Sequence, residues 1–83
     1  MKALRKAGCS CTDTHSLGHG FVDIVAGRVD GDGIPRAYLL ETKMPGGVLT
    51  DDERCWMAFW RGHVAVVHDE LEALRAVGVE MQT

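Results

Sequence analysis

The chain has 83 residues, a formal net charge of −3 and 46% hydrophobic residues, which indicate one small globular domain spanning residues 1–83. Its apolar runs fall short of the roughly 18 residues needed to cross a membrane, and its basic start lacks the apolar core of a signal peptide, so a cytoplasmic protein is expected. Three cysteines without a secretion signal argue against a disulfide framework, and the acidic charge disfavours tight non-specific binding of nucleic acid.

The first part of the chain predicts a short helix and a strand. Residues 2–7 favour a helix that Gly8 ends. Residues 9–14 favour a strand, which would place Cys9, Cys11 and Asp13 on one face, and residues 16–20 form a loop.

Two apolar runs around a glycine-rich turn predict an antiparallel hairpin. The runs span Phe21–Gly27 and Ala37–Lys43, and the cluster Asp30–Pro35 lies between them. We expect Arg28 to pair with Arg36 across this turn.

That register places two acids of the hairpin directly opposite each other. Asp23 faces Glu41, with Cβ atoms roughly 4.5–5.5 Å apart, and Lys43 shares the face of Glu41 because it lies two residues further along. Both acids interrupt runs of Val, Ile, Leu and Ala, and such breaks of local rules tend to mark functional sites.

The second half predicts a helix, a strand and a final helix. Thr50 begins the first helix through a capping box with Glu53, and Val64–Val67 reads as an interior strand reached by a parallel crossover. Asp69 caps a last helix that runs to about Val77. The predicted inward residues are Cys55, Trp56, Phe59 and Trp60 on the first helix and Leu71, Leu74 and Val77 on the last.

The resulting element order is α-β-β-β-α-β-α, an α/β fold with a mixed sheet flanked by helices. The paired acids within it suit a divalent cation. Hard oxygen ligands favour Mg²⁺, which keeps several waters and accepts a phosphate oxygen. Lys43 can orient a water or stabilise charge on phosphate. Without a cation the opposed carboxylates repel, so neutralising either acid is expected to raise stability by up to about 1 kcal/mol.

Four segments in order resemble the small PD-(D/E)XK nucleases of phages and prophages, in the VRR-NUC-like branch related to Holliday-junction resolvases. The likeness covers roughly residues 8 to 78 and is carried by Gly20–Gly27, Tyr38–Lys43, Leu49–Trp56 and Gly62–Val67. The resemblance implies a minimal restriction-endonuclease-like core and a Mg²⁺- or Mn²⁺-dependent endonuclease acting on DNA, in a bacterial or phage-infected host cell.

The same resemblance implies roles for individual residues. Asp23, Glu41 and Lys43 would form the catalytic set, with the carbonyl of Thr42 joining the two acids at the metal. Three departures stand out: Val22 replaces the Pro of the family name, Glu53 stands where a Gln is frequent, and residues 1–7 lack the acid that many relatives carry on the first helix.

Other features of the sequence allow two alternative functions. Cys9, Cys11, His15 and His19 have the side-chain chemistry of zinc ligands, which suggests a small zinc-stabilised interaction protein as an alternative. Glu53 and His19 are candidate accessory residues for metal or phosphate. The missing first-helix acid and the negative charge suggest another alternative, a catalytically inactive module of the same fold that binds nucleic acid or protein.

The short length of the chain also predicts that it associates with a second copy of itself. A domain of this size buries only about 60% of its unfolded surface, and a second copy would add stability. A two-fold homodimer is expected, since closed two-fold symmetry is the commonest solution for small oligomers. Such a dimer would suit branched DNA as substrate.

Overall fold

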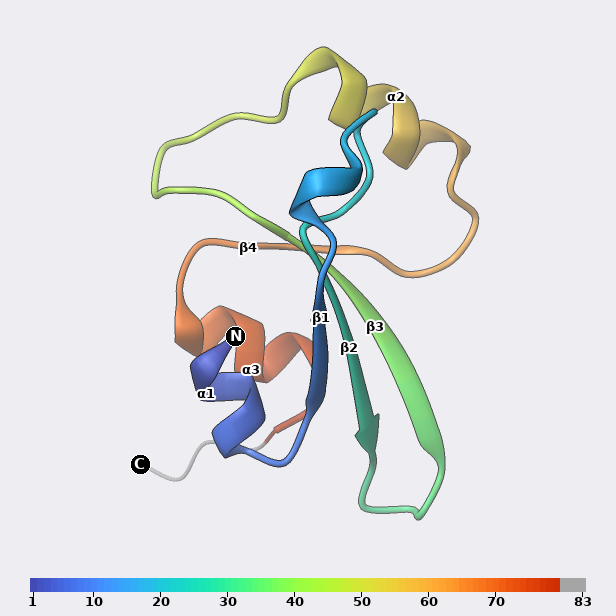
Figure 1. Ribbon diagram of the computed structural model, residues 1–83, viewed down its shortest axis with the longest axis vertical. Coiled ribbons are helices and arrows are strands. Elements are labelled where there is room, and N and C mark those ends of the chain that lie inside the picture. The colour runs from blue at the N-terminus through green and yellow to red at the C-terminus, as the bar shows by residue number, and fades with distance from the viewer. Residues whose placement is uncertain (80–83) are drawn as a thin grey trace.

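The computed structural model describes residues 1–79 and shows one mixed sheet with three helices (Figure 1). The predicted α/β class and the order α-β-β-β-α-β-α are confirmed. In chain order the elements are α1 (Lys2–Lys6), β1 (Ser10–Asp13), the 3₁₀ turn η1 (His15–Leu17), β2 (Ile24–Val29), β3 (Pro35–Thr42), α2 (Asp51–Phe59), β4 (Ala65–Val67) and α3 (Glu70–Ala76).

The sheet has the strand order β1-β2-β3-β4, with antiparallel pairs up to β3 and a parallel pair between β3 and β4. The predicted pairing of Arg28 with Arg36 is confirmed. The prediction of an interior strand at Val64–Val67 is wrong, because β4 is a short edge strand on which Val66 is exposed. An apolar run of four residues specifies a strand but not its position in the sheet.

The tip of the β2–β3 hairpin is held by a network around one half-buried carboxylate, that of Asp30. Arg28 and Arg36 lie directly opposite each other, where like charges repel. Asp30 relieves this repulsion, since its carboxylate pairs with Arg28 at 2.8 Å and also with Arg36. The hydroxyl of Tyr38 donates to the same carboxylate at 3.0 Å. The hairpin register is therefore stabilised by side chains as well as by backbone pairing.

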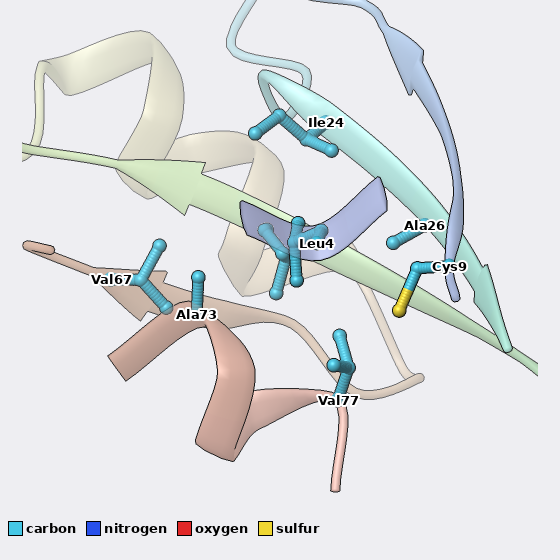
Figure 2. Packing of buried hydrophobic residues seen from close by; sticks show 8 residues of the cluster. Leu4, Cys9, Ile24, Ala26, Val67, Ala73 and Val77 are labelled. Carbon is cyan, nitrogen blue, oxygen red and sulfur yellow. The ribbon is translucent and has the colours of Figure 1, made fainter. Parts of the chain in front are cut away.

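The core lies between one face of the sheet and the pair of helices α1 and α3, which contact each other (Figures 1 and 2). Cys9 is buried in this core and Cys11 packs against it, so both thiols face the same side as predicted. The buried cluster consists of Leu4, Cys9, Ile24, Ala26, Leu40, Val67, Ala73 and Val77.

The terminal helices begin and end at the predicted residues, within one position. Gly8, at φ +96°, follows α1, and the Asp69 carboxylate accepts a hydrogen bond from the Glu72 amide at the start of α3. Val77 is buried and Leu74 is half-buried against the core. Leu71 was expected to face inward and is exposed instead. Ala73 takes the contact with the sheet, because the small side chain lets the short helix approach closely.

Helix α2 lies beyond the end of the sheet, apart from α1 and α3 (Figure 1). The expected buried stripe is therefore wrong: every residue of α2 is exposed or half-buried, and Phe59 is 87% exposed. The helix instead packs on the loop before β2, where Phe21 meets Trp56 edge-to-face at 5.3 Å between ring centroids. Trp60 stacks on Trp56 at 5.0 Å. Helical periodicity identified an apolar face but not the surface that covers it.

Among residues 1–79, every helix is too short or too polar to cross a membrane.

Candidate active site

The site is built where the β2–β3 pairing ends. The register that pairs Ile24 with Leu40 continues to place Asp23 opposite Glu41. The Asp23 amide donates to the Leu40 carbonyl at 3.1 Å, which holds Asp23 against β3. The predicted juxtaposition of the two acids therefore follows from backbone pairing.

The carboxylate of Asp23 is held from two sides. Its Oδ2 accepts hydrogen bonds from the Thr42 amide at 3.0 Å and the Thr42 hydroxyl at 2.7 Å. Its Oδ1 lies 3.0 Å from Nδ1 of His15, whose ring is 82% exposed. Burial opposes ionisation of Asp23, but the bonds from His15 and Thr42 outweigh it and lower the pKa to about 2. This lowered pKa predicts instead that neutralising Asp23 lowers stability, because the change would weaken these bonds.

The environment of Glu41 disfavours its ionised form, whereas that of Asp23 favours it. Its side chain is 1% exposed, and its Oε2 has no hydrogen-bond partner among the residues described. Burial, followed by the neighbouring carboxylates of Glu53 and Asp23, raises the pKa of Glu41 to about 8. A buried carboxyl with an unpaired oxygen is costly in free energy, so the fold carries this group at the expense of stability.

Lys43 directly follows β3 and reaches the site beside Glu41, but it does not pair closely with Glu41. Its Nζ lies 2.7 Å from Oε1 of Glu53 and 3.9 Å from Oε1 of Glu41. The hydrogen bond to Glu53 is the main cause that raises the pKa of Lys43, so the side chain is an ammonium at neutral pH.

Glu53 enters the site through the start of α2. The predicted capping box is present: Glu53 Oε1 accepts from the Thr50 amide at 2.8 Å, and Thr50 Oγ1 accepts from the Glu53 amide at 3.2 Å. Burial opposes ionisation of Glu53, but Lys43 and the Thr50 amide lower its pKa to about 2. Glu53 therefore combines a structural and a site contact, whereas His19 is exposed and forms no hydrogen bond within residues 1–79.

Gly20 lies where the loop before Asp23 contacts the start of α2, the helix that contains Glu53. It has φ +80°, and a Cβ built on it would lie 2.2 Å from the Asp52 carbonyl oxygen. Only glycine permits both this backbone conformation and this approach. The two halves of the site are thus brought together by direct backbone contact.

We expect Gly20→Ala to lower the free energy of unfolding by about 1–3 kcal/mol more than Gly18→Ala in urea denaturation. Gly18 is the matched control, because it also has positive φ, at +66°, but nothing lies within 4 Å of its built Cβ. Equal costs for the two changes would show that the contact with α2 is absent in solution.

The alternative zinc cluster is not assembled in the described residues. No group of three or more His, Cys, Asp or Glu side chains in residues 1–79 is placed to hold a metal ion. Cys9 packs in the core, and His15 contacts Asp23 instead of a thiol. The same finding means that Asp23 and Glu41 offer a pair of carboxylates and not a complete protein cage.

Two carboxylates nevertheless fit a magnesium ion, which commonly takes one or two protein carboxylates and completes its shell with water and phosphate oxygens. The unpaired Oε2 of Glu41 is the observation that favours a cation here, because a positive charge would satisfy this oxygen. Asp23 would contribute an already ionised carboxylate after releasing His15.

Comparisons with known proteins return no matching family model, no matching curated protein and no matching solved structure. The nuclease resemblance therefore depends on the sequence motifs alone.

Three contacts of this site were not predicted from the sequence. The Thr42 hydroxyl and amide, and the ring of His15, hold the Asp23 carboxylate. Glu53 was expected to act as a cap or at the metal, and it also binds Lys43. The capping box was the available signal, because it fixes the direction of the Glu53 side chain.

Proposed function

We propose that this protein is a metal-dependent endonuclease that hydrolyses DNA phosphodiester bonds. The observation that carries the proposal is the buried Glu41, whose Oε2 lacks a partner in the described structure, beside the ionised Asp23 and the ammonium of Lys43. Opposed acids at the end of a hairpin with a lysine two residues along are also what the nuclease resemblance implies.

Each residue then has a chemical task. Asp23 and Glu41 would hold Mg²⁺ or Mn²⁺, with the Thr42 carbonyl as an additional oxygen. The bound metal would polarise the phosphodiester and lower the pKa of a water. Lys43 orients the attacking water and stabilises the negative charge that builds on phosphate. Thr42 keeps the Asp23 carboxylate in place through two hydrogen bonds.

The test is a panel of branched, duplex and single-stranded DNAs incubated with Mg²⁺ or Mn²⁺. Metal-dependent cleavage supports the proposal. Binding without cleavage would favour an inactive module of this fold, and zinc that co-purifies in stoichiometric amount would favour the interaction protein.

We expect branched DNA to be cut faster than linear duplex, with cleavage that weakens as salt rises. The net charge of −3 and the few basic residues leave phosphate contacts as a modest, salt-sensitive source of affinity. Initial cleavage rates on a four-way junction and on its unbranched arms, across a salt series, measure this preference. Equal rates would indicate a generic nuclease.

We expect a two-fold homodimer at tens of micromolar in sedimentation velocity. The exposed apolar face of α2, with Phe59 and Cys55, supports this because it has no covering element in the described fold. Phe59→Asp should shift the equilibrium toward monomer, whereas Val29→Asp, an exposed control on the hairpin, should not. A monomer in both the parent and the Phe59 variant would remove the case for symmetric cutting of junctions.

A further inference from the structure

Two acidic side chains, Glu41 and Glu53, lie near the Lys43 ammonium, and the ammonium lies much closer to Glu53. A flexible ammonium beside a buried acidic side chain such as Glu41 is expected to pair with it. Lys43 Nζ instead lies 2.7 Å from Glu53 and 3.9 Å from Glu41. Only the Glu53 contact is within hydrogen-bonding distance.

The side chain of Glu53 is held in place by contacts that do not involve Lys43. Glu53 Oε1 accepts a hydrogen bond from the Thr50 amide at 2.8 Å and is also the atom that lies 2.7 Å from Lys43 Nζ. The capping box sets its rotamer, and the contact of Gly20 with the backbone at Asp52 sets the position of the helix. The acceptor is therefore rigid, because backbone contacts on both sides determine where it lies.

We propose that Glu53 is a positioning residue that anchors the Lys43 ammonium at the edge of the Asp23–Glu41 pair. The inference rests on the nuclease function proposed above and adds a role that capping alone does not require. Two consequences follow from the geometry. The anchored ammonium stays close to the reacting phosphate without occupying the Oε2 position of Glu41, which remains free for a cation. The lysine also loses its rotational freedom before substrate binds, which lowers the entropic cost of the chemical step.

Three variants separate positioning from capping. Glu53→Ala removes the acceptor for both Lys43 and the Thr50 amide. Glu53→Gln keeps an acceptor oxygen at the same place. Thr50→Ala removes the capping hydroxyl but leaves the Thr50 amide and the Glu53 carboxylate, so it reports the loss of the cap alone.

With junction DNA and saturating Mg²⁺, Glu53→Ala should lower kcat by about 10- to 100-fold while KM stays near the parent value. Glu53→Gln should keep kcat within about threefold of the parent, and Thr50→Ala should lower thermal stability with little change in kcat. Mg²⁺ should still raise the melting temperature of Glu53→Ala. Unchanged kcat in Glu53→Ala would overturn the proposal, as would loss of the Mg²⁺ shift, which would make Glu53 a metal ligand.

A double-mutant cycle tests the contact itself without DNA or metal. Unfolding free energies of the parent, Lys43→Met, Glu53→Ala and the double variant should be non-additive, because the two side chains interact directly. Additive values in a parent that cleaves DNA would overturn the positioning role alone. A parent that cleaves no DNA would refute the proposed function, whatever the cycle shows.

Discussion

Asp23→Asn, Glu41→Gln and Lys43→Ala are each expected to reduce DNA cleavage by at least about a hundredfold, because each removes a charge that the proposed reaction requires. The two acid variants and the lysine variant should lose cleavage for different reasons. Removing an acid weakens the binding of Mg²⁺, whereas removing Lys43 spares the metal and loses the chemical step. Initial rates at saturating Mg²⁺ measure the loss of cleavage.

Thermal melting with and without Mg²⁺ separates the two kinds of failure. Mg²⁺ should raise the melting temperature of the parent and of Lys43→Ala, but not of the acid variants, because a ligand stabilises only the fold that binds it. Asp32→Asn is the matched control, since Asp32 lies on the hairpin turn and pairs with Arg36 away from the site. Parental cleavage in the three site variants would refute the nuclease proposal, as would an equal Mg²⁺ shift in all forms.

The stability of the metal-free protein is expected to fall as pH rises from about 4.5 to about 8, because of Glu41. Burial raises the pKa of this carboxyl from 4.5 to about 8, so the folded state keeps a proton that the unfolded chain releases. The stabilising contribution is complete below pH 4.5 and is lost as pH passes through the folded-state value. Its total size is on the order of a few kcal/mol, a large part of the stability of a small domain.

Glu41→Gln should flatten this pH dependence and make the metal-free protein more stable than the parent at pH 8. Urea denaturation between pH 5 and pH 8.5, with a chelator present, measures both effects. Asp23→Asn serves as the contrast, because the lowered pKa of Asp23 contributes stability that is present above pH 3.8 and is lost only as pH falls toward 2. Identical slopes in the parent and Glu41→Gln would show that Glu41 is ionised and solvated in the fold.

Local rules were sufficient for the hairpin and the helix starts. The pairing of Arg28 with Arg36 followed from the turn between two apolar runs, and period-two geometry then placed Asp23 and Glu41 together. The Thr50 capping box is likewise decided within four residues of chain. These features were predictable because each depends on neighbours in sequence or on one backbone register.

Sequence patterns were therefore sufficient to predict the element order and the pairing of the two acids, whereas the surface against which each face packs depends on the tertiary fold. Periodicity could not show that α2 lies beyond the sheet with Phe59 exposed, or that β4 is an edge strand. The contact of Lys43 with Glu53 likewise depends on how the loop after β3 places the start of α2 beside the end of the strand. These outcomes arise from contacts between segments distant in the chain, and burial depends on such contacts and not on local propensity.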